Sequence, residues 1–224
     1  MDNYNRYNWW LLYVLLLASN SGYGSVSIVN NDRGSGLTMT QLSEDLATVR
    51  QGRILFSHHS VGANIISGMK RLDTDIGGAG HLRLANLEAA ISSKGPMLID
   101  FTGGKNQEPK TKIDAFAATI RDNSNLKPDL AFMKFCYVDF NPQTDVDELF
   151  RYYSRTILTL KHEHPEIQFA HVTVPLTTTP TDLKHRIFRF IGKEVWEDMA
   201  NVKRTEFSRR IKETFGSDPV FELA

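Results

Sequence analysis

The chain has little cysteine, no net charge and only one apolar run of any length. Its single cysteine, Cys136, excludes an internal disulfide framework and a zinc site built from cysteines. Lys plus Arg and Asp plus Glu number 26 each, so the formal net charge is zero. Nor is there a basic stripe interleaved with aromatic residues. Nothing in this balance indicates a nucleic-acid partner or an anionic membrane surface.

The one apolar run, residues 9–18, follows Arg6 and precedes a small, polar stretch. It is shorter than the roughly 20 residues that span a bilayer, and the order of the regions is typical of a secretory signal. We therefore expect a signal peptide over residues 1–24, with an uncleaved membrane anchor as the alternative. Residues 25–37, rich in Gly, Ser and Asn, resemble a linker. The expected location is secreted or periplasmic, with membrane contact only through an uncleaved N-terminal segment.

What is present is a globular composition over one domain, residues 38–224. Hydrophobic residues make up 41% and charged residues 23%, which are ordinary values for a folded protein. Short apolar runs alternate with helical patterns, which predicts a three-layer α/β/α sandwich around a mainly parallel sheet. We predict strands at residues 53–57, 96–102, 129–137, 167–174 and 220–223. We predict helices at residues 39–49, 61–72, 109–120, 146–164 and 183–215, the last one broken near Gly192.

Ser60 lies where the first predicted strand turns into a helix. Ligands bind at the carboxyl ends of parallel strands, and the N-terminus of the following helix can stabilise an anion there. Gly62, two residues later, allows the backbone to approach whatever occupies the site. Ser60 is therefore a candidate nucleophile, although serine is also a common helix N-cap. The G-x-S-x-G elbow does not fit, because position 58 is His.

Five blocks of sequence carry a family resemblance. In chain order they are SHHSVGANI, FTGGKNQEPKTKIDAF, KPDLAFMKFCYVDF, FAHVTVPLT and DPVFELA. They resemble the SGNH (GDSL-like) hydrolase superfamily, and within it a bacterial branch in which a His-x-Ser-Val-Gly block replaces the usual Gly-Asp-Ser. The resemblance implies a flavodoxin-like, five-stranded sheet and a serine esterase that needs no cofactor. Its substrate would be a small-molecule or glycan ester, such as an O-acyl group on a carbohydrate.

The resemblance also implies roles for individual residues. The amides of Ser60 and Gly104 would stabilise the oxyanion, although paired glycines after a strand can equally form a tight turn. At the end of the third strand the family's Gly-x-Asn-Asp block keeps only Asp139, with Val138 in the Asn position. Asn106 could supply the missing amide. Asp139 could also be an ordinary turn residue. Further substrate contacts are expected from His59, Gly62, Asn64 and Asp139.

The general base of SGNH hydrolases is a His in an Asp-x-x-His block after the last strand. Glu222 falls near the Asp position, and no His follows it. Three explanations are open: a truncated reading frame, another residue as base, or a protein that does not hydrolyse esters. The alternative function is a catalytically inactive, SGNH-like envelope protein that binds a glycan or a protein partner. A generic binding domain in which Ser60 only caps a helix is a third reading.

The histidines do not predict a metal site. His58 and His59 are adjacent, and neighbouring strand residues point to opposite faces, so at most one can face the site. His171 lies inside an apolar run and is expected to be a hydrogen-bonded core residue. Cys136 is likewise expected to be buried. We therefore predict no metal and no cofactor.

Overall fold

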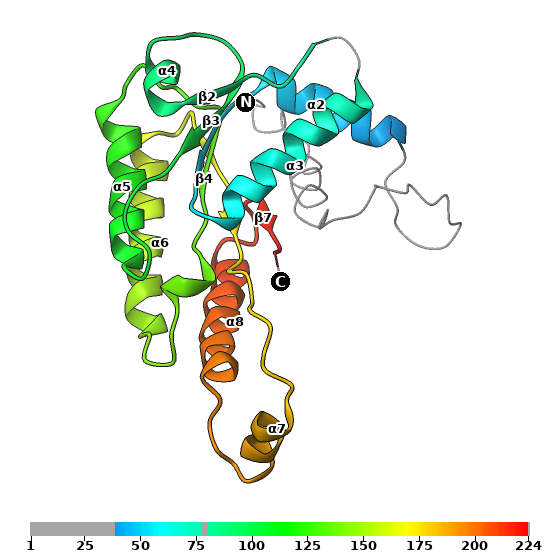
Figure 1. Cartoon of the computed structure of the whole chain (residues 1–224). Helices are drawn as coiled ribbons and strands as arrows, with labels where there is room; N and C mark the ends of the chain where they lie inside the picture. The colour runs from blue at the N-terminus through cyan, green and yellow to red at the C-terminus, as the bar shows by residue number, and fades with distance from the viewer. Residues whose placement is uncertain (1–38, 78–79, 224) are drawn as a thin grey trace.

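The computed structural model of the chain describes residues 39–77 and 80–223 (Figure 1). The predicted signal or anchor, residues 1–24, and the linker, residues 25–37, lie outside the described residues. In the part that is described, no helix is both long and apolar enough to cross a lipid bilayer.

Five parallel strands form the central sheet, in the order β2-β3-β1-β4-β5, and two further short strands pair with each other. This confirms the predicted α/β class with a parallel five-stranded sheet. The strands are β1 (Arg53–Ser57), β2 (Leu84–Asn86), β3 (Met97–Phe101), β4 (Leu130–Met133), β5 (Gln168–Phe169), β6 (His171–Val172) and β7 (Val220–Phe221). The sequence did not predict β2, because three residues are too few to show an alternating pattern. β4 is also shorter than predicted, since the backbone leaves the ladder after Met133.

β6 continues β5 after a single residue, Ala170. The Ala170 N–H donates to the carbonyl of Ala131 in β4 at 3.1 Å, whereas the His171 N–H donates to Pro219 O at 2.9 Å, just before β7. Successive amides along a strand point to opposite sides, so β7 lies across the β5–β6 run from β4. The predicted strands therefore follow the flavodoxin-like order 2-1-3-4-5, and β2 is an added edge strand beyond β3.

Helices cover both faces of the sheet (Figure 1). They are α2 (Met39–Gln51), α3 (Val61–Ile76), α4 (Leu87–Ile91), α5 (Pro109–Asp122), α6 (Val146–Glu163), α7 (Leu183–Phe190) and α8 (Trp196–Thr214), with a 3₁₀ turn η1 (Tyr137–Asp139) after β4. α3 packs on one face and α5, α6 and α8 on the other. The predicted helix break near Gly192 falls between α7 and α8.

The alternation of side chains along β1 explains the layers. Ile54 and Phe56 belong to the apolar cluster beneath α3, whereas Leu55 belongs to the cluster beneath α5 and α6. Each fully buried side chain of this size contributes about 1.5–3 kcal/mol of hydrophobic free energy. The strand is therefore held from both faces, which fixes the position of the residues that follow it.

The buried side chain of Arg53 stabilises the amino edge of the sheet through hydrogen bonds to neighbouring segments. Its guanidinium donates to the carbonyls of Leu126, Ala90 (2.7 Å), Gly95 (2.9 Å) and Ser93 (3.2 Å). These bonds tie the start of β1 to the end of α4 and to the loop before β4.

An arm leaves the body at the carboxyl edge of the sheet. After β6 the chain runs outward to α7 and returns through α8 (Figure 1). No residue of α7 is buried, and Phe190 is 91% exposed. At the root of the arm, Arg204 donates to Thr177 Oγ1 at 2.9 Å and to Tyr137 O at 3.0 Å. The root is thereby fixed to η1.

Candidate active site

The carboxyl ends of β3, β1 and β4 meet at the centre of one edge of the sheet. The ladder continues one step beyond β1, because His58 N–H donates to Phe101 O and Lys134 N–H donates to Ser57 O, each at 2.9 Å. After β1 the chain crosses to β2 and β3 on one side of β1. The later strands β4 and β5 lie on its other side. This is a topological switch point, where α/β proteins bind ligands.

Ser60 stands at this edge in an unusual backbone conformation. Its φ of 44° and ψ of −103° lie outside the regions that residues with a side chain normally adopt. Ser60 is exposed and occupies the N-cap position of α3, yet its side chain accepts no capping hydrogen bond. The structure therefore does not support the reading in which Ser60 only caps the helix.

Two backbone amides near Ser60 are available as donors. Within residues 39–77 and 80–223, neither the Ser60 N–H nor the Gly104 N–H donates a hydrogen bond. Gly104 has a φ of +73°, and a Cβ added there would lie 2.5 Å from the backbone nitrogen of Lys112. Only glycine therefore fits the tight turn between β3 and α5. Gly104 can therefore form this tight turn and still offer its N–H to an oxyanion.

His58 lies beneath the first turn of α3. Its ring is 4% exposed and its Nε2 is 2.8 Å from Oδ1 of Asp100 at the end of β3. Burial lowers the pKa of His58, and the Asp100 carboxylate opposes this effect. A Cβ on Gly62 would overlap the His58 ring, so Gly62 makes room for this histidine. The close approach expected at Gly62 is therefore to His58.

The other expected substrate contacts are spread around Ser60. The half-buried His59 ring donates from Nε2 to Gly103 O at 2.9 Å and so bridges β1 and the loop after β3. Asn64 is exposed one helical turn after Ser60, on the same side of α3. Glu222 is exposed directly after β7 and pairs with Lys212 at 3.2 Å. Three strand spacings separate β7 from β1, roughly 14 Å in the plane of the sheet.

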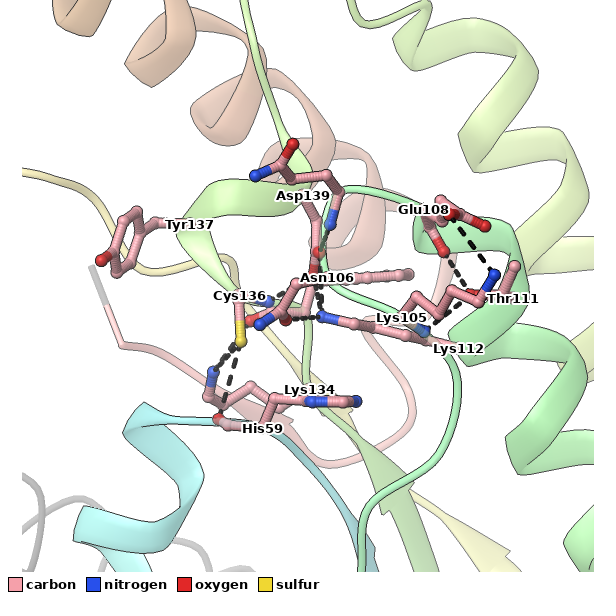
Figure 2. Close-up of polar contacts among 12 residues, drawn as sticks. His59, Lys105, Asn106, Glu108, Thr111, Lys112, Lys134, Cys136, Tyr137 and Asp139 are labelled. Carbon is pink, nitrogen blue, oxygen red and sulfur yellow. Dashed lines mark hydrogen bonds and ion pairs between the residues drawn. The ribbon is translucent and has the colours of Figure 1, made fainter.

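The Asp139 side chain is buried and enclosed by hydrogen-bond donors. Its carboxylate accepts hydrogen bonds from Lys112 Nζ at 2.6 and 2.8 Å, Cys136 N–H at 2.7 Å and Gln107 N–H at 3.0 Å (Figure 2). These four contacts hold together η1, α5 and the loop after β3. We therefore assign Asp139 a structural role in place of the expected substrate contact.

Asn106 belongs to the same cluster. It is exposed, and its Oδ1 accepts from Lys112 Nζ at 2.8 Å (Figure 2). This bond fixes the orientation of the amide and leaves its NH₂ group on the opposite side, free of protein acceptors among the described residues. Asn106 can therefore donate to a ligand, as the sequence suggested.

Lys134 is the residue that sequence reasoning missed. It follows β4 directly and is 1% exposed. Its Nζ donates to Phe135 O at 3.0 Å and contacts Cys136 Sγ at 3.7 Å, while Cys136 Sγ lies 3.6 Å from His59 O (Figure 2). Burial lowers the pKa of Lys134. The available signal was a lysine inside the apolar run AFMKFCY.

The predicted core residues are confirmed. Cys136 is 1% exposed, although it lies just after β4 and not within it. His171 is fully buried, accepts from the Tyr153 hydroxyl at 2.8 Å, donates toward Asp218 at 3.2 Å and stacks on Phe215. No group of three or more His, Cys, Asp or Glu side chains among the described residues is arranged to hold a metal ion.

Comparisons of the chain with protein-family models, with curated proteins and with solved structures found no match. No family is therefore identified for the chain. The fold rests on the structure, and the resemblance to SGNH hydrolases stays an interpretation of the sequence blocks.

Proposed function

We propose that this protein is a serine-type ester hydrolase with Ser60 as its nucleophile. The observation that carries the proposal is the backbone of Ser60, a residue with a side chain held at a φ of 44° where the central strand ends. Such strained conformations cost about 1–3 kcal/mol and cluster at functional sites. The strain presents an exposed hydroxyl that the helix does not use as a cap.

The proposed reaction uses the groups around this turn. Ser60 Oγ attacks the acyl carbon, and the Ser60 and Gly104 amides receive the negative charge that develops on the carbonyl oxygen. The N-terminus of α3 adds a favourable electrostatic field, and the Asn106 NH₂ group is a further hydrogen-bond donor. Collapse of the intermediate releases the alcohol and leaves an acyl-Ser60 ester, which water then hydrolyses.

Substrate and location come from the sequence alone. The resemblance to SGNH hydrolases supports a small-molecule or glycan ester, in particular an O-acyl group on a carbohydrate. The run at residues 9–18 supports export to the periplasm or the medium.

A non-catalytic binding protein is the second candidate. It is favoured by one observation: in the described residues, the Ser60 hydroxyl has no hydrogen bond to a base. The same edge of the sheet would then hold a glycan or a protein partner without turnover. Apo active sites often have long or poorly aligned catalytic hydrogen bonds, so this observation does not outweigh the strained serine.

The deciding experiment is intact-mass analysis after exposure to a fluorophosphonate probe. We expect one adduct on the wild type and on Ser67→Ala, whose serine is exposed on α3, and no adduct on Ser60→Ala. Adduct that persists in Ser60→Ala would refute the nucleophile. Absence of adduct from every variant would favour the binding protein.

A further inference from the structure

The structure contains two buried lysines beside the candidate site, and their surroundings differ. Lys112 and Lys134 are each 1% exposed and extend from α5 and from the end of β4. An ammonium group has three N–H donors, whereas a neutral amine has two and a lone pair. The number of acceptors around each nitrogen therefore indicates which form the site is built to hold.

Lys112 is surrounded as an ammonium. Its Nζ contacts three acceptor oxygens, Asn106 Oδ1 and both carboxylate oxygens of Asp139, at 2.6–2.8 Å (Figure 2). The charge is compensated by a carboxylate that is itself buried. Such a pair is a structural element, and removing either partner leaves an uncompensated charge.

Lys134 is surrounded as a neutral amine. Its Nζ has two acceptors, Phe135 O and Cys136 Sγ, and no carboxylate within ion-pair distance among the described residues. Burial is the largest cause of its lowered pKa; Lys112 lowers it further, while Cys136 and Asp139 oppose the shift. Lys134 is also one of the groups that lower the pKa of His58. A neutral Lys134 amine would use both of its N–H donors in these two contacts and keep its lone pair free.

A chain of contacts links the Lys134 amine to the residue that precedes the proposed nucleophile. Cys136 Sγ contacts both the Lys134 amine, at 3.7 Å, and the carbonyl oxygen of His59, at 3.6 Å (Figure 2). β1 and β4 are adjacent strands, and the ladder pairs Ser57 with Met133. Lys134 and the turn at Ser60 thus follow neighbouring strands, which lie one strand spacing apart.

We propose that Lys134 is the general base of this site and makes it a serine–lysine hydrolase. The inference rests on the proposed function of Ser60. As Ser60 Oγ bonds to the acyl carbon, its proton passes to the Lys134 lone pair. The ammonium then gives this proton to the departing alkoxide as the ester C–O bond breaks. In the second half, Lys134 takes a proton from the attacking water and returns it to Ser60.

This assignment explains why a buried amine that has no counterion among residues 39–77 and 80–223 lies at the switch point. Burying an amine without a counterion lowers the free energy of unfolding. A buried lysine of this kind therefore points to a function. A base that works near neutral pH must be deprotonated there, and burial is the ordinary means of achieving this for lysine.

The test is the rate of fluorophosphonate labelling against pH. In the wild type we expect the rate to rise with pH, with a midpoint below 10.4, the ordinary pKa of lysine. Lys134→Met should label at least about a hundredfold more slowly, and Lys134→Arg, which keeps a cation but cannot accept a proton, should be equally slow. Lys70→Met, on the exposed surface of α3, is the matched control and should label normally.

Urea unfolding of the same variants separates a catalytic role from a structural one. Lys134→Met should be at least as stable as the wild type, because methionine fills the space without a buried amine. A slow-labelling variant that is well folded therefore supports the base. Normal labelling of Lys134→Met, with Ser60→Ala unlabelled, would overturn the role of Lys134 and leave Ser60 in place. A midpoint at or below 6.5 that is abolished by Asp100→Asn would transfer the role to His58.

Discussion

Ser60 combines an exposed side chain with a backbone that glycine adopts far more easily. We expect Ser60→Gly to be more stable than Ser60→Ala by about 1 kcal/mol or more, because only the alanine variant keeps a Cβ at positive φ. Urea unfolding followed by circular dichroism measures the difference. Equal stability of the two variants would mean that the turn is not strained.

Gly62 is needed for a different reason, the space that the His58 ring occupies. Gly62→Ala should lower the free energy of unfolding by about 1–3 kcal/mol, since the added methyl group overlaps a buried ring that has no room to move. Gly68→Ala, in the middle of the same helix, is the comparison. A Gly62→Ala variant as stable as Gly68→Ala would contradict the packing of His58 under α3.

Lys112 should respond to methionine in the opposite way from Lys134. Lys112→Met leaves the Asp139 carboxylate buried without its cation, and breaking such a pair typically costs about 3–5 kcal/mol. The midpoint of urea unfolding should therefore fall well below that of the wild type. A small effect would show that the Asp139 carboxylate is held by its other donors without Lys112.

Among the elements, β1 depends on contacts at both of its ends. At the amino end the Arg53 guanidinium satisfies carbonyls of α4 and of the loops around β3 and β4. Arg53→Met should cost at least about 2 kcal/mol, because several buried carbonyls lose their donor. Thermal unfolding, with the exposed Arg71→Met of α3 as control, tests this. A change no larger than that of the control would argue against this role.

For the whole molecule, two buried histidines predict acid sensitivity. Burial lowers the pKa values of His58 and His171 in the folded state. Below the unfolded value of about 6.5 the unfolded chain binds protons that the folded chain does not, so stability falls as pH drops through 6.5 toward the folded values. Each unit of difference contributes about 1.4 kcal/mol.

Urea midpoints at pH 7.5 and 5.5 measure this loss. The carboxylates with lowered pKa values, such as Asp73 and Asp218, titrate below this interval and contribute little to it. His171→Gln should reduce the loss, because glutamine keeps polar contacts but takes up no proton. A loss that His171→Gln leaves unchanged would place the sensitivity elsewhere.

The sequence by itself determined the local elements. Apolar side chains repeating every two or every 3.6 residues fixed the alternation of strands and helices, the turn at Ser60, the break near Gly192 and the burial of Cys136 and His171. These are short-range patterns, because each depends on the side that a residue presents to a neighbouring layer. The same patterns did not predict β2, and they made β4 too long. The bounds of both strands depend on pairing partners elsewhere in the chain.

Only the tertiary structure decided the chemistry of the site. Lys112 and Lys134 are the same residue type in the sequence, and they differ because Asp139, 27 residues from Lys112, places its carboxylate against only one of them. Likewise, Asp100 meets His58 only because β3 lies beside β1. Charge state and hydrogen bonding depend on what is nearby in space, and strand order in the folded sheet sets those neighbours.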